Sequence, residues 1–153
     1  MKKLIILLIA LSLCGAGAGA QTGGGPAKSA AASREAAAGE QFRVLTEKYF
    51  ISYMKAQLDP MLATLHPQGP MYPQEWAIKR LRETAQGNAV PGEAKASAVK
   101  VLDLGETTAR AQMTMKMRAD VMHNGNYSEQ TALLTVEYHK LGNEWRIWKI
   151  EKK

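Results

Sequence analysis

The sequence predicts an α+β domain in which N-terminal helices pack on a curved, four-stranded antiparallel sheet. Three observations carry this prediction. Residues 40–86 space their apolar side chains three and four apart, as helices do, whereas residues 99–150 alternate apolar and polar side chains, as strands do. Tight-turn sequences separate the alternating segments, so each strand is expected to return antiparallel beside the one before it. Helices followed by a run of strands are typical of an α+β domain.

The first 20 residues have the three parts of a bacterial-type secretory signal peptide. Lys2 and Lys3 give a positively charged start, residues 4–13 are apolar apart from Ser12, and Ala18-Gly19-Ala20 is an A-x-A cleavage site. The apolar run is shorter than the roughly 20 residues that a membrane-spanning helix needs. We therefore expect export and cleavage near Ala20, which gives a secreted or periplasmic protein.

Cys14, the single cysteine, offers an alternative fate for the N-terminus. It lies just after the apolar run, where acylation would give a lipoprotein anchored to the membrane. The preceding Leu13 is larger than the side chain that lipoprotein processing prefers. Free secretion is therefore the first expectation, and anchoring through Cys14 is the alternative. Cleavage after Ala20 would leave no cysteine, so the domain would have to fold without a disulfide.

Residues 21–37 are expected to form a flexible Gly/Ala/Ser-rich linker, and residues 38–153 the folded domain. The linker includes Gly23-Gly24-Gly25-Pro26 and has little to bury in a core. Its alanine-rich end has a high intrinsic helix propensity. The length that remains suffices for one domain with a hydrophobic core.

Three helical segments are expected in the first half of the domain. The first begins near Glu40 and has one wide apolar face. That face comprises Phe42, Leu45, Tyr49, Phe50, Tyr53, Met54 and Leu58. Asp59-Pro60 ends this helix and starts a short one, because Asp is a good N-cap and Pro suits the first helical position. After a break at residues 66–70, a third helix is expected over residues 73–86, closed by Gly87.

Four strands are expected after Pro91-Gly92, and the second is the clearest. The first strand contains Val99 and Val101 and turns at Gly105. The apolar set of the second strand is Ala111, Met113, Met115, Met117, Ala119 and Val121. Asn124-Gly125 is a hairpin signal that leads into the third strand, and a tight turn at residues 141–144 leads into the fourth.

The charge pattern does not indicate a nucleic-acid-binding protein. The formal net charge is +6, and Lys2 and Lys3 supply two of these charges. The dense basic cluster Lys79-Arg80-Leu81-Arg82 lies on a predicted amphipathic helix, where a solvated helix face explains it. We expect no nucleic acid as a partner, and contact with a membrane only if Cys14 is lipidated.

The aromatic-bearing first helix, the long hairpin and the last strand together resemble the nuclear transport factor 2-like superfamily, also called SnoaL-like. Its most typical element here is Gly142-Asn143-Glu144-Trp145-Arg146-Ile147-Trp148-Lys149-Ile150, and the resemblance covers roughly residues 38–152. It implies a cone-shaped α+β fold and is compatible with a homodimer formed through the sheet. The superfamily includes ketosteroid isomerase-like enzymes, small-ligand binders and non-catalytic domains of secretion and transport assemblies. The fold alone does not choose between them.

The sequence favours a binding domain over an enzyme. Enzymes of this superfamily place acid–base groups on the inner wall of the cone. In the second predicted strand, the alternate residues expected to face this wall are all apolar, and Asp120 belongs to the opposite, polar face. No set of residues matches the isomerase pattern of paired acids and a tyrosine, so we predict no catalytic residue. The alternative is a small isomerase- or dehydratase-like enzyme with an acid in the cone, for which Asp103 and Glu137 are the first candidates.

Neither a metal nor a cofactor is expected. His66, His123 and His139 are not spaced with one another or with acids as the three or four ligands of a zinc site are. The sequence after Ala20 also contains no phosphate-binding glycine loop and no nucleophile elbow.

The candidates for ligand binding are large side chains expected in the interior. They are Tyr49, Tyr53, Trp76, Met113, Met115, Met117, Tyr138 and Trp148. Methionine adapts to irregular shapes, and tyrosine and tryptophan add polar atoms. The simpler explanation is that these side chains fill the core. The predicted function is therefore an exported, non-enzymatic domain that binds a partner protein or a small apolar ligand.

Trp145 and Trp148 cannot both face the interior of a regular strand, because residues at an odd separation point to opposite faces. Either one of them is exposed and marks a protein contact, or the strand contains a bulge.

Overall fold

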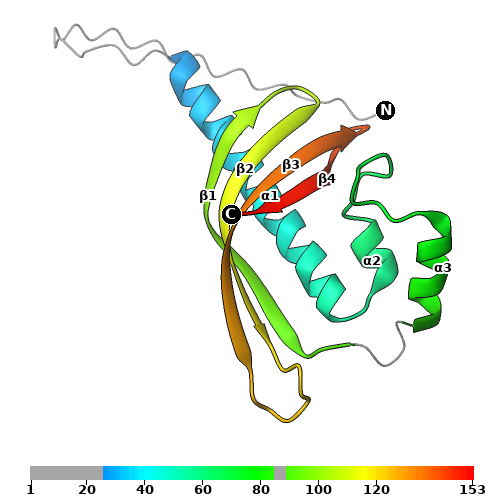
Figure 1. The fold of residues 1–153 in the computed structure, drawn as a ribbon. Coiled ribbons are helices and arrows are strands. Elements are labelled where there is room, and N and C mark those ends of the chain that lie inside the picture. Colours follow the sequence, from blue (N-terminus) through cyan, green and yellow to red (C-terminus); the bar gives the residue numbers. More distant parts are fainter. Residues whose placement is uncertain (1–25, 85–88) are drawn as a thin grey trace, which may run out of the picture.

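The computed structural model describes residues 26–84 and 89–153. The predicted signal peptide, Cys14, residues 21–25 of the predicted linker and Gly87 lie outside the described residues. The helices are α1 Pro26–Met54, α2 Leu58–Leu62 and α3 Glu75–Thr84 (Figure 1). The strands are β1 Gly92–Leu104, β2 Thr108–Ala119, β3 Ser128–Leu141 and β4 Glu144–Lys152. The predicted α+β order is confirmed.

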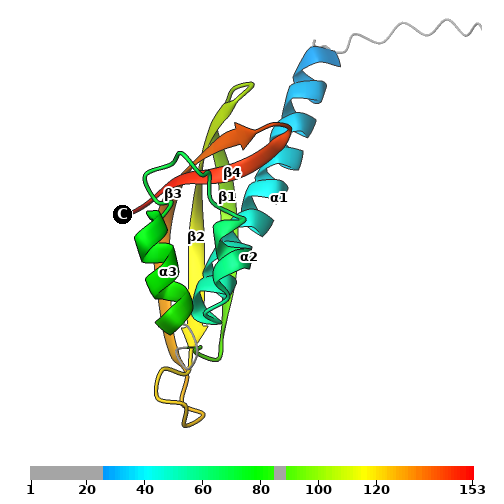
Figure 2. The same cartoon turned by 90° about the vertical axis from the view of Figure 1, so that its right-hand side faces the viewer.

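The four strands form one antiparallel sheet in the order β1-β2-β3-β4, so each strand pairs with its neighbour in the chain. Register shifts interrupt β1 between Ser97 and Lys100 and between Val101 and Asp103. Bulges of this kind bend a strand and increase its twist. Figure 2 shows the curved sheet with α1 running along one face of it, and α2 and α3 following at the C-terminal end of α1.

The hydrophobic core lies between α1 and the sheet. The ring of Phe42 is fully buried, stacks on Tyr138 at a centroid distance of 4.1 Å and meets Trp145 edge-on at 5.4 Å. The hydroxyl groups of Thr46 and Tyr138, both fully buried, share a hydrogen bond of 2.7 Å. One helix face is thereby joined to the centre of β3 by stacking and by a satisfied polar pair.

The start of α1 corrects the prediction of a flexible linker over residues 21–37. Residues 26–37 are helical. Residues 29–37 are exposed, and burial begins at Ala38. The high helix propensity of alanine explains why the helix extends beyond the part that packs on the sheet.

The end of β2 also differs from the alternating pattern. β2 ends at Ala119, and the next residue, Asp120, turns its carboxylate to accept hydrogen bonds from the backbone N–H groups of Asn124 (3.1 Å) and Gly125 (2.7 Å). Gly125 has a φ of +82°, which glycine adopts without steric cost. Asp120 therefore shapes the hairpin turn, and Val121 is 62% exposed instead of continuing the buried face.

A bulge resolves the orientation of the two tryptophans of β4. Tyr138 pairs with Ile147 and Glu137 pairs with Lys149, which makes Trp148 the extra residue of β4. Trp145 packs against Phe42 in the core, whereas the ring of Trp148 stacks on His139 at 4.0 Å. Both rings are half-buried.

Candidate functional site

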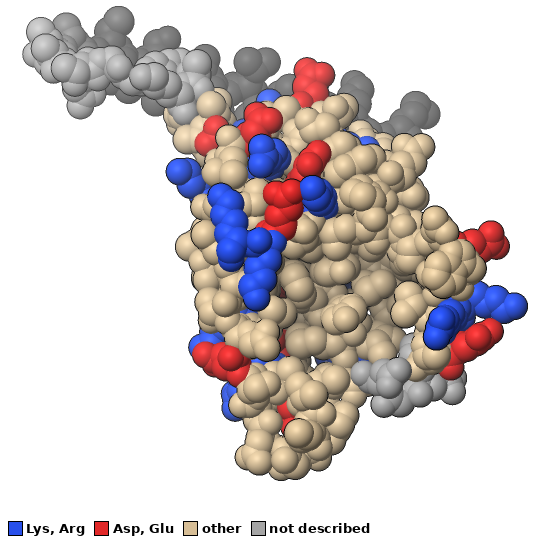
Figure 3. Space-filling model, in the orientation of Figure 1, with Lys and Arg blue, Asp and Glu red and all other residues tan. Residues whose placement is uncertain are grey.

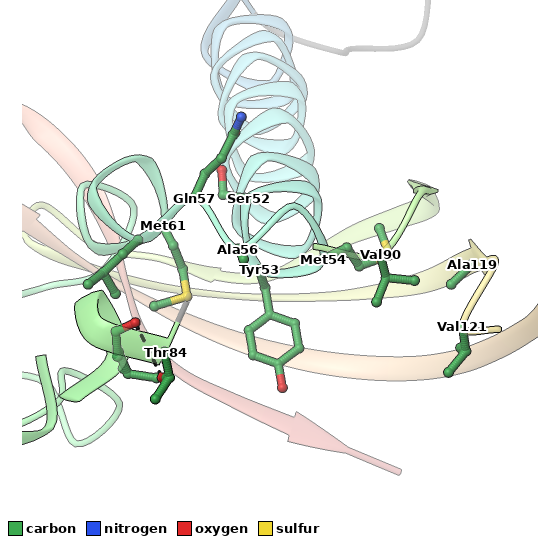
Figure 4. Close-up of a pocket in the computed structure, with 12 residues that line it drawn as sticks. Ser52, Tyr53, Met54, Ala56, Gln57, Met61, Thr84, Val90, Ala119 and Val121 are labelled. Atoms are coloured by element: carbon green, nitrogen blue, oxygen red, sulfur yellow. Dashed lines mark hydrogen bonds between the residues drawn. The ribbon is translucent and has the colours of Figure 1, made fainter. Parts of the chain in front are cut away.

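A cavity of about 420 Å³ lies where the C-terminal end of α1 meets α2, α3 and the end of β2 (Figure 4). Its apolar lining consists of Met54, Ala56, Leu58, Met61, Leu81, Val90, Ala119 and Val121. Its polar lining consists of Ser52, Tyr53, Gln57 and Thr84. The volume falls within the range of about 300–1,000 Å³ that is typical of ligand pockets.

The C-terminal end of α1 forms one wall of the cavity and is closed by a specific backbone turn. Ala56 has a φ of +51°. The N–H of Gln57 donates to the carbonyl of Ser52 at 2.9 Å, and the N–H of Ala56 donates to the carbonyl of Tyr53 at 3.1 Å. This pair of bonds around a left-handed residue is the Schellman motif, which satisfies carbonyl groups at a helix end.

Close backbone contacts join this end of α1 to the sheet. The N–H of Val90 donates to the carbonyl of Met54 at 2.7 Å. At Gly92, a Cβ atom would lie 2.6 Å from the carbonyl oxygen of Arg118 and 3.0 Å from the sulfur of Met54. Only glycine fits here without displacing the backbone, so the start of β1 can approach both β2 and the wall of the cavity.

The opposite wall comes from α2 and α3. Within the described α3, no residue is buried, and Arg82 pairs with Asp59 of α2 at 2.8 Å. Both side chains of this ion pair are exposed, and such pairs contribute between about 0 and 1 kcal/mol. Figure 4 shows Met61 and Thr84 on one side of the cavity, Val90, Ala119 and Val121 on the other, and Tyr53 between them.

The lining is suited to holding a neutral apolar molecule. Among the described residues that line the cavity there is no Asp, Glu, His, Lys or Arg. A carboxylate or imidazole that could transfer a proton to a bound molecule is therefore absent from this part of the wall. What the wall offers is apolar carbon, two thioether sulfurs and a few hydroxyl and amide groups.

Most of the eight residues predicted to bind a ligand do not line this cavity. Of the eight, Tyr53 lines it and is 66% exposed. Met113, Met115 and Tyr138 are fully buried, and Met117 and Tyr49 pack against the same core. The space between α1 and the methionine face of β2 is thus filled by side chains, as the simpler explanation of the sequence held. Burial raises the pKa of Tyr49 and raises the pKa of Tyr138 further.

The two remaining candidates lie elsewhere on the molecule. Trp76 of α3 is 66% exposed, and its ring N–H donates to Gln74 at 2.7 Å. Trp148 stacks on His139, whose Nε2 lies 2.8 Å from a carboxylate oxygen of Glu137. Because Glu137 and His139 alternate with the buried Tyr138, this group occupies the other face of the sheet.

Asp103 and Glu137, the two candidate acids if the protein were an enzyme, do not line the cavity. Asp103 is exposed on β1, and Glu137 is engaged with His139 on the sheet face away from the core. Over residues 26–84 and 89–153, no group of three or more His, Cys, Asp or Glu residues could hold a metal ion.

A second, more open hollow lies between α1 and β1 and has a volume of about 570 Å³. Two of its charged lining side chains, Glu40 and Arg43, pair with each other. Arg43 bonds Glu40 at 2.6 Å and Glu47 at 2.8 Å, and Glu47 also accepts the N–H of Ala96 at 2.8 Å. The hydrogen bond from Arg43 lowers the pKa of Glu40. These groups stabilise the contact of α1 with the edge strand.

The surface charges are mixed. Figure 3 shows Lys and Arg side chains beside Asp and Glu side chains on the visible face, both near α3 and beside the sheet. None of the helices that the structure describes is long and apolar enough to cross a membrane.

What the cavity's missed residues share is their position in turns and at element ends. Met61 lies in the short α2, Val90 precedes β1, and Val121 follows β2. Val90 lies outside the helices and strands, where no periodic pattern exists, and the five residues of α2 are too few to show one. Val121 continues the alternation of β2 in the sequence, but the strand ends before it. The signals in the sequence were the breaks themselves, at Asp59-Pro60 and Pro91-Gly92.

Comparisons with known proteins show the fold. No protein-family model matches the chain, and no curated protein matches it by sequence. Among solved structures, the association domain of C. elegans CaMKII is similar with a TM-score of 0.60 and 12% identity, covering 78% of this chain and 98% of that one. A nuclear transport factor 2-like superfamily protein from Salmonella enterica has a TM-score of 0.55 and 17% identity, covering 77% of this chain and 91% of that one.

A third similar structure is a scytalone dehydratase-like protein from Novosphingobium aromaticivorans, with a TM-score of 0.58 and 10% identity. The match covers 82% of this chain and 85% of that one. Together these similarities confirm the cone-shaped nuclear transport factor 2-like fold that the sequence resembles. At such low identities they show the fold alone, and this fold includes both ligand-binding and enzymatic members.

Proposed function

We propose that this nuclear transport factor 2-like cone is a non-enzymatic binding domain that holds a small apolar molecule at the C-terminal end of α1. The observation that carries the proposal is the cavity of about 420 Å³, whose described lining is mostly apolar and bears no charged side chain. Moving apolar surface out of water contributes about 25 cal/mol per Å², so such a wall favours an apolar ligand. A protein partner is the alternative predicted from the sequence.

The enzyme alternative is less well supported than binding. Asp103 and Glu137 lie away from the cavity, and Ala111, Met113 and Met115 of β2 are packed into the core. The name of the scytalone dehydratase-like neighbour applies to that protein, and 10% identity extends only to its fold.

Filling the cavity is expected to abolish binding of an apolar probe. Ala119 lines the cavity, so Ala119→Phe would put a ring into its volume. We expect Nile red, a neutral fluorescent probe, to bind the wild-type domain with one saturable site. We expect Ala119→Phe to weaken its affinity by a factor of at least about ten, because each lost 1.4 kcal/mol is tenfold. A fluorescence titration measures both.

Two further variants make this test specific. Ala30→Phe introduces the same side chain on the exposed part of α1 and is expected to leave the affinity unchanged. Val121→Trp starts from an exposed side chain at the rim, so it should narrow the cavity without disturbing the core. Equal affinity of wild type and both cavity variants would contradict the proposal and favour the protein-partner alternative.

We also propose that the domain functions after export, on the strength of the N-terminal sequence. The intact mass of the protein isolated from its own cell envelope or medium should correspond to a chain that begins at Gln21. Ala20→Leu, which removes the small residue at the cleavage site, should retain the uncleaved precursor. A diacylated product beginning at Cys14 would support the lipoprotein alternative, and an uncleaved wild-type chain in the cytoplasm would contradict both.

A further inference from the structure

Ser52 gives the cavity a hydroxyl group that bonds no other described residue. Ser52 is 3% exposed, lies in the last turn of α1 and lines the cavity. Its carbonyl accepts the N–H of Gln57, but no hydrogen bond joins its hydroxyl to another described residue. A serine inside a helix ordinarily satisfies its hydroxyl by donating to the carbonyl four residues earlier.

Two other buried hydroxyls, of Thr46 in α1 and of Thr64 in the turn after α2, do have partners. Thr46 bonds the hydroxyl of Tyr138 at 2.7 Å, and Thr64 donates to the carbonyl of Met61 at 2.6 Å. Among the described residues, the side-chain oxygen that is sealed from solvent without a partner is Oγ1 of Thr135 on β3, so the hydroxyl of Ser52 is open to the cavity. A molecule in the cavity is therefore within reach of the hydroxyl of Ser52.

The other residues of the cavity wall indicate which class of molecule the cavity would bind. The other polar lining residues, Tyr53, Gln57 and Thr84, are exposed at the rim. No charged side chain is among the described lining, and a buried charge without a partner is strongly unfavourable. The thioethers of Met54 and Met61 are polarisable and make favourable contacts with aromatic rings.

We propose that the ligand is a neutral aromatic molecule with a single hydroxyl or carbonyl group, and that this group forms a hydrogen bond with Ser52. The inference rests on the proposed function, since it names the class of ligand for the same cavity. The aromatic body occupies the apolar wall, and Ser52 orients it by acting as donor or acceptor. Ser52 is thus a specificity-determining residue of the site.

The test compares two probes of nearly equal shape, 2-naphthol and 2-methylnaphthalene, by calorimetric titration. The wild-type domain should bind 2-naphthol between about twofold and about tenfold more tightly than 2-methylnaphthalene, which corresponds to the net contribution of one hydrogen bond. Ser52→Ala should remove this preference and leave the affinity for 2-methylnaphthalene unchanged. The variant is expected to fold, because alanine has the higher helix propensity. Ser29→Ala, at an exposed position of the same helix, should keep the preference.

The outcomes separate this inference from the proposed function. Equal binding of both probes by the wild type, or a preference that survives in Ser52→Ala, overturns the role of Ser52 and leaves an apolar site intact. Tighter binding of the charged 2-naphthoate than of 2-naphthol overturns the neutral ligand class. Binding of neither naphthalene probe overturns the inference, and if Nile red also fails to bind, the proposed function falls with it.

Discussion

Phe42→Ala is expected to lower the free energy of unfolding by about 4 kcal/mol, within the range of about 3–5 kcal/mol for truncating a buried phenylalanine. The ring of Phe42 is fully buried and contacts both Tyr138 and Trp145. Its removal would leave a cavity between α1 and two strands and would also remove two aromatic contacts. Because domains of this size are stable by about 5–15 kcal/mol, the loss is a large fraction of the total. Urea unfolding followed by tryptophan fluorescence measures it.

Tyr53→Ala is the matched control for this loss. Tyr53 lies three turns later on the same helix and is also aromatic, but it is 66% exposed. We expect its truncation to change the free energy of unfolding by about 0.5 kcal/mol or less. If the two variants lost similar stability, Phe42 would not anchor α1 on the sheet.

Tyr138→Phe is expected to lower stability at neutral pH by about 1–3 kcal/mol. The substitution keeps the ring but leaves the hydroxyl of Thr46, which is fully buried, without its partner at 2.7 Å. In the double variant Tyr138→Phe/Thr46→Val, both partners become apolar at nearly constant volume. We expect that variant to recover most of the loss. No recovery would mean that the hydrogen bond is not the source of the effect.

The same substitution is expected to weaken the loss of stability in alkali. Burial raises the pKa of Tyr138 above the ordinary value of about 10, so the folded chain keeps a proton that the unfolded chain releases. Stability is therefore fully present below about pH 10 and falls as the pH rises beyond it, by up to about 1.4 kcal/mol per unit. Tyr49, whose pKa burial also raises, contributes in the same direction.

Urea unfolding at neutral pH and at several values above about pH 10 measures this dependence. Tyr138→Phe should make the alkaline decline shallower, whereas the part caused by Tyr49 should remain. Tyr127→Phe is the control, because the ring of Tyr127 is 44% exposed. An unchanged decline in Tyr138→Phe would contradict the assignment.

The interior of the sheet could be predicted from local pattern. The alternation at Ala111, Met113 and Met115 places these residues on one face wherever β2 runs, and all three are fully buried. The alternation did not predict burial correctly beyond the end of the strand, because Asp120 turns the chain and leaves Val121 exposed. Trp148 was ambiguous for the same reason, because a bulge changes the phase without a sequence signal of its own.

The cavity depended on contacts that no local pattern contains. Met61, Val90 and Ala119 lie in separate parts of the chain and become neighbours only because α1 stops at the Schellman turn around Ala56 and β1 approaches at Gly92. The sequence indicated large interior side chains as ligand-binding candidates, and most of them were required to fill the core. Whether a side chain fills a core or lines a space depends on the volume left by its neighbours, which is a property of the packing.

The sequence by itself determined the order of helices and strands and the buried face of β2, because these follow from periodicity, turn residues and the sum of local preferences. The cone-shaped fold was implied by the resemblance of the last strand, the long hairpin and the first helix to the nuclear transport factor 2-like superfamily. Only the tertiary structure decided that the methionines are packed without a ligand-sized space, that Trp76 is exposed, and that Ser52 faces a cavity. The physical reason is that helix and strand patterns specify which side of an element is apolar. The position at which elements end, and the space left between those ends, are set by contacts between residues far apart in the chain.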